Sequence, residues 1–311
     1  MSQDIVFHPY IADLLQKAFA NPSPPFAEQT LAQVRATRDQ AITTLMGPGE
    51  EVARVEDRRV PVTGGEIALR LYFPSHKRPL PVMVWFHGGG WVLGSLATHD
   101  GPCRALANLS GHCIASVDYR LAPEHKFPTG VHDCLAATRW VAENGSGLGL
   151  DPANLSIGGD SAGGGLAFGV ALLARDQGGP AISRMIAAYP AVDLTTFDTP
   201  SFKKYWDKVI LDGPAVDYYR TQYLKGPADA ADPLASPLLA TDLSGLPPCL
   251  VVTAEHDVLT SEGEAMAQRL RQSGVNTEYV CFPGMIHLFF GMGRLTNEEN
   301  GLALAARFMA G

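Results

Sequence analysis

Short apolar segments alternate with longer amphipathic segments along most of this chain. The short segments are mostly continuous apolar runs, as is typical of strands buried on both faces of a parallel sheet. The longer segments have the spacing of helices, and Gly274 provides a stop signal for one of them. This alternation predicts an α/β fold in which helices flank a mostly parallel, twisted sheet. The expected strands are residues 81–86, 154–160, 185–188, 248–254 and 277–282, and the expected helices are residues 166–174, 265–272 and 302–309.

Two regions depart from this alternation. Residues 1–45 have helical periodicity that the proline-rich segment 21–25 interrupts, and residues 193–225 are rich in aromatic side chains. Aromatic side chains fit a packed core as well as the wall of a ligand site. The length of 311 residues is compatible with a single domain, residues 1–311, because α/β domains of this size often remain undivided. The aromatic residues of the second region are Phe197, Phe202, Tyr205, Trp206, Tyr218, Tyr219 and Tyr223.

The net charge of −8 is spread along the chain without a block of like charges. This distribution argues against binding to nucleic acid or to an anionic membrane surface. No basic-then-apolar signal segment is present, and no apolar run is long enough to span a bilayer. The five cysteines lack the spacing of metal ligands, so we expect reduced core residues in a cytoplasmic protein that uses no metal or cofactor. They are Cys103, Cys113, Cys134, Cys249 and Cys281.

The candidate chemistry begins where the predicted strand 154–160 meets the helix that follows it. The residues Gly159-Asp160-Ser161-Ala162-Gly163 match the nucleophile elbow, a sharp strand-to-helix turn with the pattern Gly-x-Ser-x-Gly. Small residues two positions before and after the serine prevent clashes in this turn. In a chain with 32 glycines the pattern alone can arise by chance, but the flanking elements favour an elbow. Ser161 is therefore the candidate nucleophile.

A second glycine-rich segment follows the predicted strand 81–86. It reads His87-Gly88-Gly89-Gly90-Trp91, and its glycines allow the backbone to come close to a ligand. Attack on an ester carbonyl creates an oxyanion that backbone N–H groups must stabilise. We expect such donors from this loop and from Ala162, the residue after the nucleophile. Taken alone, the segment also fits a simple turn between a strand and a helix; the elbow downstream favours the oxyanion role.

The acid and the base should follow the serine in that order along the chain. Asp257 and His287 each lie just after a predicted strand, where α/β sheets place their ligand-facing loops. His287 would accept the proton of Ser161, and Asp257 would hold the tautomer of the imidazole. Glu255 is the rival acid, and His256 is a less favoured base on the acid's own loop. We expect most of the remaining histidines outside the glycine-rich loop to be surface or structural residues; they are His8, His76, His99, His112, His125 and His132.

These segments resemble the hormone-sensitive-lipase-like esterases, the bacterial family IV carboxylesterases of the α/β-hydrolase superfamily. The resemblance runs in the family's order from about residue 55 to 290. Three positions depart from it: Gly165, Val258 and Leu288 stand where asparagine, proline and glycine are common. Besides the elbow and the glycine-rich loop, the matching segments are Asp118-Tyr119-Arg120-Leu121-Ala122-Pro123-Glu124-His125, Glu255-x-Asp257 with Glu262-Gly263-Glu264, and Gly284-Met285-Ile286-His287.

The resemblance implies an α/β-hydrolase fold with a helical cap built from about residues 1–45 and about 193–225. It implies a catalytic triad of Ser161, Asp257 and His287. The oxyanion donors that it implies are Gly89, Gly90 and Ala162, with Gly88 shaping the loop and His87 tying it in place. The expected residues of the substrate pocket are Trp91, Asp160, Phe202, Tyr205, Trp206 and Leu288.

The sequence thus predicts a serine carboxylesterase that forms an acyl-enzyme on Ser161. The resemblance adds short- to medium-chain esters as substrates, the Gly-Asp-Ser-Ala-Gly subgroup because of Asp160, and a homodimer. An amidase or peptidase with the same triad is an alternative, because acyl transfer from nitrogen needs only better protonation of the leaving group. A non-catalytic ligand-binding protein on the same scaffold is another, although such proteins have lost part of the triad.

Overall fold

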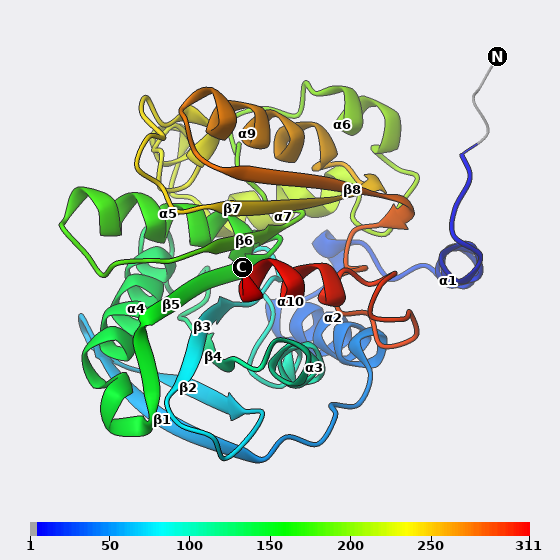
Figure 1. The fold of residues 1–311 in the computed structure, drawn as a ribbon. Helices are drawn as coiled ribbons and strands as arrows, with labels where there is room; N and C mark the ends of the chain where they lie inside the picture. The colour runs from blue at the N-terminus through cyan, green and yellow to red at the C-terminus, as the bar shows by residue number, and fades with distance from the viewer. Residues whose placement is uncertain (1–4) are drawn as a thin grey trace.

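An eight-stranded sheet forms the centre of the computed structural model, which describes residues 5–311 (Figure 1). The strand order is β1-β2-β4-β3-β5-β6-β7-β8. The pairs β1–β2 and β2–β4 are antiparallel, and all other neighbours are parallel. The strands are β1 (Arg54–Val62), β2 (Gly65–Phe73), β3 (Leu80–Phe86), β4 (Cys113–Asp118), β5 (Leu150–Asp160), β6 (Met185–Ala188), β7 (Cys249–His256) and β8 (Thr277–Ile286).

The prediction of a mostly parallel sheet is confirmed, and all five expected strands are present as β3, β5, β6, β7 and β8. The interior strand β6 is buried throughout, in keeping with its continuous apolar sequence. Strand β1, in contrast, alternates between exposed and less exposed residues at one edge of the sheet and carries five charged side chains. It has no apolar run, which explains why the hydrophobic pattern did not reveal it.

Helices flank the sheet, with α3 packed against α10 and α4 against α5 (Figure 1). The three predicted helices lie within α5, α9 and α10. Within residues 5–311 we find no helix that combines the length and the apolar character needed to cross a bilayer. The helices are α1 (Pro9–Ala20), α2 (Leu31–Met46), α3 (Asp100–Ser110), α4 (Thr129–Leu148), α5 (Ala162–Asp176), α6 (Pro200–Tyr205), α7 (Gly213–Tyr223), α8 (Pro227–Ala230), α9 (Thr260–Gln272) and α10 (Leu302–Ala310), with 3₁₀ turns at Phe26–Glu28 and Pro237–Leu239.

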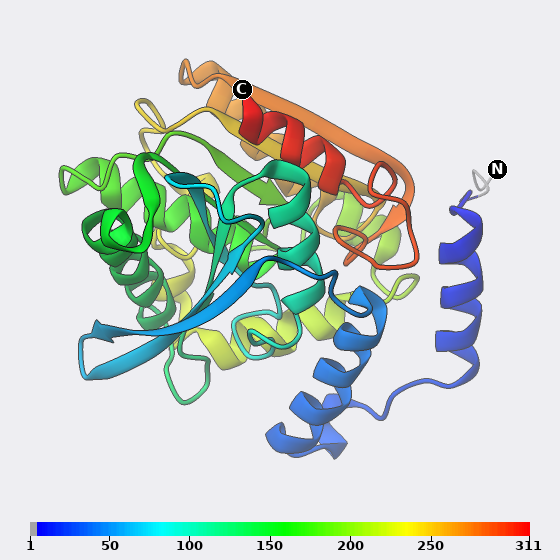
Figure 2. The same cartoon turned by 60° about the horizontal axis from the view of Figure 1, so that its bottom comes forward.

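The N-terminal helices α1 and α2 lie at one side of the molecule (Figure 2). Helix α1 reaches the sheet at β8, where the N–H of His8 donates to the Gly284 carbonyl oxygen at 2.9 Å. A capping box between Thr30 and Gln33 starts α2 after the proline-rich break. Phe26 stacks on Tyr218 of α7 with ring centroids 4.3 Å apart, so the two regions that departed from the strand–helix alternation touch each other. Residues 1–4 of the first predicted cap segment lie outside the described residues.

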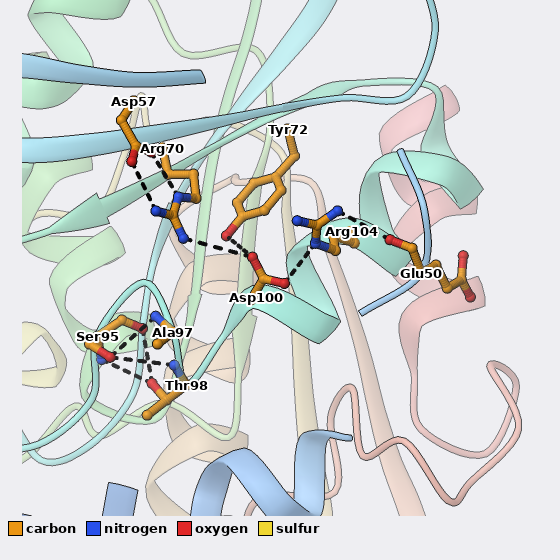
Figure 3. Close-up of polar contacts among 9 residues, drawn as sticks. All are labelled: Glu50, Asp57, Arg70, Tyr72, Ser95, Ala97, Thr98, Asp100 and Arg104. Atoms are coloured by element: carbon orange, nitrogen blue, oxygen red, sulfur yellow. Dashed lines mark hydrogen bonds and ion pairs between the residues drawn. The ribbon is translucent and has the colours of Figure 1, made fainter. Parts of the chain in front are cut away.

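A polar cluster joins the edge of the sheet to α3 (Figure 3). Asp100, at the start of α3, accepts hydrogen bonds from the Tyr72 hydroxyl at 2.9 Å and from Nε of Arg104 at 2.6 Å. Arg70 on β2 donates two hydrogen bonds to Asp57 on β1, at 2.7 and 2.9 Å. Since α3 follows the glycine-rich loop, this cluster fixes one end of the segment that carries the candidate oxyanion donors.

The cysteines are all unpaired, but one of them is not a core residue. Cys281 is exposed on β8, so the expectation of a buried thiol there was wrong. The physical reason is its position: β8 forms the second edge of the sheet, and its side chains alternate between the protein and solvent. The buried cysteines are Cys103, Cys113, Cys134 and Cys249.

Candidate active site

Ser161 occupies a sharp turn between β5 and α5. Its backbone has φ 57° and ψ −120°, a region that residues with a side chain rarely adopt. The glycines on either side are required sterically: a Cβ at Gly163 would collide with the carbonyl of Phe86, and a Cβ at Gly159 would collide with the backbone of Gly163. The turn therefore has the geometry of the elbow expected from the sequence, with the Ser161 side chain facing a cavity.

His287 and Asp257 continue from Ser161 in one hydrogen-bonded chain. Nδ1 of His287 lies 2.6 Å from Oδ2 of Asp257, and Nε2 lies 2.9 Å from Oγ of Ser161. An ionised carboxylate can only accept, so Nδ1 carries the proton and Nε2 is left to accept the hydroxyl proton of Ser161. Asp257 is fully buried, and its other oxygen accepts the N–H of Leu259 at 3.0 Å. The carboxylate is thus held in place from both sides.

The topology of the sheet explains why these distant residues meet. Ser161, Asp257 and His287 directly follow β5, β7 and β8, which run parallel within one half of the sheet. The carboxyl ends of parallel strands share an edge, where α/β proteins build their ligand sites.

The rival acid and the rival base face other partners. Glu255 is about half exposed and accepts the N–H of Gly284 at 2.8 Å. His256 is buried, with Nδ1 2.8 Å from the Tyr205 hydroxyl and Nε2 2.9 Å from the Val6 carbonyl oxygen. In this geometry the two residues anchor neighbouring segments and do not contact Ser161.

The glycine-rich loop lies beside Ser161 and lines the same cavity. Gly89 and Gly90 have φ values of 117° and 60°, which favour glycine. A Cβ at Gly90 would also collide with the ring of Tyr219 on α7. Ala162 is the first residue of α5, so its N–H has no acceptor within the helix. Among the described residues, the N–H groups of Gly89, Gly90 and Ala162 donate to no protein acceptor.

His87 holds the glycine-rich loop in place. Its Nδ1 lies 2.7 Å from the Gly88 carbonyl oxygen, and its own carbonyl oxygen accepts the Tyr119 hydroxyl at 2.9 Å. The imidazole also stacks on the ring of Tyr119 at 4.3 Å. Burial, helped by the nearby His99, lowers the pKa of His87 to about 4, so the ring is neutral at physiological pH.

A second buried pair, Asp160 and His99, also supports the loop. Asp160 accepts the N–H of Gly88 at 3.1 Å, and its Oδ1 lies 3.2 Å from Nε2 of His99. Burial alone would raise the pKa of Asp160, but the charge and hydrogen bond of His99 hold it below its ordinary value. Nδ1 of His99 lies 2.8 Å from the hydroxyl of Thr98, which closes a turn with Ser95 (Figure 3).

The cavity in front of Ser161 has a volume of about 120 Å³. Of the expected pocket residues, Trp91, Phe202 and Leu288 line it. Asp160, Tyr205 and Trp206, which were also expected there, do not line this cavity. Asp160 supports the loop, the Tyr205 hydroxyl bonds to His256, and Trp206 is 40% exposed.

Both regions assigned to the cap contribute to the cavity wall. The N-terminal region provides α2 side chains, and the second region provides side chains of α7 and of the segment before it. The α2 residues are Arg38, Ala41, Ile42 and Leu45, and the others include Phe197, Ile210, Leu211, Ala215, Val216, Tyr219 and Arg220.

Glu262, which in the sequence belongs to one of the segments that carry the family resemblance, also lines the cavity. It is 3% exposed, and its Oε1 accepts the N–H of Val192 at 2.7 Å. Burial is the main cause that raises the pKa of Glu262 to about 8. The only signal in the sequence was an acidic residue in the first turn of α9, where carboxylates are common for helix stability alone.

Comparison with known proteins places these features in context. The model of a family described as "alpha/beta hydrolase fold" matches residues 83–291. Carboxylesterase NlhH of Mycobacterium tuberculosis is 41% identical over 262 residues, which cover 81% of this chain and 82% of NlhH. An arylesterase of Saccharolobus solfataricus is 36% identical and covers 93% of the chain and 94% of its own length. The structure of a hyperthermophilic esterase from the archaeon Pyrobaculum calidifontis superposes with a TM-score of 0.93 at 40% identity, covering 98% of both chains.

Proposed function

The chain belongs to the α/β-hydrolase fold family and is a carboxylic ester hydrolase of the hormone-sensitive-lipase-like group, and we propose that it acts through an acyl-enzyme on Ser161. The observation that carries this proposal is the hydrogen-bonded chain from Asp257 through His287 to Ser161. The Asp160 of its elbow supports membership of the Gly-Asp-Ser-Ala-Gly subgroup.

In the proposed reaction, His287 takes the Ser161 proton on Nε2 while Oγ attacks the ester carbonyl carbon. The carbonyl oxygen becomes an oxyanion that accepts hydrogen bonds from the N–H groups of Gly89, Gly90 and Ala162. When the C–O bond to the alcohol breaks, His287 returns its proton to the leaving oxygen. A water molecule then gives a proton to His287 and attacks the acyl carbon, which releases the acid and restores the Ser161 hydroxyl. Asp257 stabilises the imidazolium in both halves of the reaction.

The size of the cavity supports short- to medium-chain esters as substrates. Its volume of about 120 Å³ is close to that of an engineered apolar cavity of about 150 Å³ that holds benzene. Most of the lining is apolar, apart from the reacting groups and a few ionisable side chains. A cavity of this kind takes a small acyl or alcohol group without a net charge.

The mechanism is tested by labelling with a fluorophosphonate probe followed by mapping of the modified peptide. We expect a single label on Ser161, and we expect Ser161→Ala to abolish both labelling and ester turnover while the thermal unfolding midpoint changes little. A label elsewhere, or persistent turnover in the variant, would exclude the proposed nucleophile.

The substrate class is tested with p-nitrophenyl esters of graded acyl length and with a matched p-nitroanilide. We expect the highest kcat/KM for short to medium chains and much slower cleavage of the anilide. A maximum for long chains, or activity only at an oil interface, would indicate a lipase, and efficient anilide cleavage would indicate an amidase. A cytoplasmic location and a homodimer remain predictions; the unpaired cysteines support the first.

A further inference from the structure

A second cavity lies directly behind one wall of the catalytic cavity. It has a volume of about 420 Å³ and is built from the segment after β6 and the segment between α7 and α8. Leu194 and Arg220 line both cavities, so these two residues form the wall between them. The other residues of this outer cavity are Thr195, Thr221, Leu224, Lys225, Gly226, Pro227 and Ala230.

Arg220 is the side chain that closes this wall. Its guanidinium donates hydrogen bonds to the Leu194 carbonyl oxygen at 3.2 Å and to Asp217 at 3.1 Å. It also lies over the ring of Phe197, with 4.5 Å between Cζ and the ring centroid. These three contacts hold a long, partly exposed side chain across the gap between α7 and the segment after β6.

The backbone of Leu194, which accepts the hydrogen bond of Arg220, is held in place by other contacts. Its N–H donates to the Ser236 hydroxyl at 2.8 Å, and that hydroxyl donates to the Ala230 carbonyl oxygen at 2.7 Å. The Leu194 and Ser236 side chains are both buried. The backbone at Leu194 is therefore anchored independently of Arg220, and removal of the guanidinium should open the wall without releasing the segment.

The two cavities also differ in character. The catalytic cavity has a mostly apolar lining, whereas the outer one adds the hydroxyls of Thr195 and Thr221 and the exposed Lys225 to its apolar residues. A chain that extends past Arg220 would place its apolar part against Leu194 and Leu224 and its far end near solvent. The outer cavity could thus accept the end of a longer neutral ester once the wall is open.

We propose that Arg220 is a specificity-determining residue that, together with Leu194, limits the length of the ester group bound in the catalytic cavity. This inference rests on the proposed function, because it concerns the same ester substrates. Each methylene newly buried by a longer chain corresponds to about a fourfold gain in binding. Two or three methylenes in the outer cavity therefore predict a change of more than tenfold in relative specificity.

The experiment measures kcat/KM of the wild type and of Arg220→Ala for p-nitrophenyl butyrate and p-nitrophenyl decanoate. We expect the decanoate-to-butyrate ratio to rise at least tenfold in the variant. Leu194→Ala opens the same wall from the opposite side and should raise the ratio in the same direction. Since the two changes lie on different segments, the test remains valid if one variant folds poorly.

A matched variant separates the effect of opening the wall from other effects. Asp217→Asn removes the carboxylate partner of Arg220 but leaves the guanidinium in contact with Leu194 and Phe197, so its ratio should stay within about twofold of the wild type. If Asp217→Asn changed the ratio as much as Arg220→Ala, or if the wall variants kept the wild-type ratio, the inference would be overturned. If the wild type hydrolysed neither ester, the proposed function itself would fail.

Discussion

The protein contains two hydrogen-bonded chains of an aspartate, a histidine and a hydroxyl, and only one of them has the setting of a catalytic site. Asp257 bonds to His287, whose second nitrogen lies 2.9 Å from the Ser161 hydroxyl. Asp160 pairs with His99, whose second nitrogen lies 2.8 Å from the Thr98 hydroxyl. The two chains thus share their residue types and similar distances from histidine to hydroxyl, although the histidine lies 3.2 Å from Asp160 and only 2.6 Å from Asp257.

The difference lies in the surroundings of each hydroxyl. Ser161 lines the cavity, and the N–H groups of the glycine-rich loop and of Ala162 lie beside it. Thr98 is 2% exposed and does not line that cavity. Its hydroxyl oxygen accepts the N–H of Ser95, and its O–H donates to the Ser95 carbonyl oxygen, both at 2.9 Å. An activated hydroxyl needs access to a substrate and donors for the oxyanion, which the Thr98 chain lacks.

Among the substitutions that compare the two hydrogen-bonded chains, the largest effect should come from Asp257, the acid of the chain that ends at Ser161. Asp257→Asn should lower kcat by a factor on the order of 10³–10⁴, because the amide can donate to Nδ1 and so favour the wrong tautomer of His287. The thermal unfolding midpoint should change far less than turnover. Steady-state kinetics with p-nitrophenyl butyrate and a calorimetric scan provide the two measurements.

The matched control for this prediction is Glu255→Gln. Glu255 is about half exposed and accepts only the N–H of Gly284 among the described residues, a bond that a glutamine carbonyl can also accept. Turnover should stay within about twofold, as for an ordinary surface change. A large loss with Glu255→Gln and a small one with Asp257→Asn would reverse the assignment of the acid.

A smaller effect on turnover is expected from Asp160, the acid of the hydrogen-bonded chain that includes His99 and Thr98. Asp160→Asn keeps an oxygen that can accept the N–H of Gly88 but loses the charge beside His99. Loss of a direct oxyanion donor costs roughly 10²–10³ in kcat, so an indirect change in loop position should cost about tenfold. Kinetics on the same ester measure this, and a loss as large as that of Asp257→Asn would break the distinction between the two chains.

The pH dependence of the free energy of unfolding provides an independent test of Asp160→Asn. The pKa of Asp160 is lowered in the folded state, so its stabilising contribution is present above the ordinary carboxyl pKa and is lost as the pH falls through the folded value. Asparagine does not titrate. The difference in unfolding free energy between wild type and Asp160→Asn should therefore be largest near neutral pH and shrink below about pH 4. A difference that grows in acid would contradict this account.

The sequence predicted the chain that ends at Ser161 more completely than the chain that ends at Thr98, for a physical reason. Ser161, Asp257 and His287 each follow an apolar strand, and parallel strands bring such positions to one edge of the sheet. His99 follows no strand, and its partner Asp160 lies inside the elbow, so the pairing depends on how the loop before α3 folds back. For this reason the sequence favours a surface or structural role for His99 and a pocket position for Asp160, and it does not reveal that the two pair.

The cavity wall was predictable only in outline. The aromatic-rich region 193–225 pointed to the right part of the chain, but helical spacing could not distinguish Phe202, which lines the cavity, from Trp206, which is 40% exposed. That difference arises from the packing of short helices, which depends on contacts far apart in sequence. The edge strand β1 was missed because charged residues replace its apolar signal.

A third buried carboxyl group, that of Glu262, extends the comparison because its contribution to stability changes with pH in the opposite direction to that of Asp160. Glu262 has a pKa raised to about 8, so it stays protonated in the folded protein while the unfolded chain ionises above about pH 4.5. Ionisation of Glu262 in the unfolded chain therefore lowers the free energy of unfolding progressively as the pH rises from about 4.5 to about 8. Glu262→Gln should become more stable relative to wild type across this window, by an amount on the order of 3 kcal/mol. Urea unfolding at pH 5 and pH 8.5 tests this, and a difference independent of pH would exclude the raised pKa.

Of the three substitutions within the two hydrogen-bonded chains, Thr98→Val should have the smallest effect on turnover. Thr98→Val removes the oxygen that contacts His99 and Ser95 but keeps the shape of the side chain. Loss of these buried hydrogen bonds should destabilise the protein by about 1–3 kcal/mol. Turnover of p-nitrophenyl butyrate by the folded variant should nevertheless stay within about threefold, because no atom of Thr98 lines the cavity. Fluorophosphonate labelling should remain confined to Ser161 at the wild-type rate. A loss of labelling in folded Thr98→Val would mean that this hydroxyl takes part in the chemistry, and the two chains would then have to be treated as one connected system.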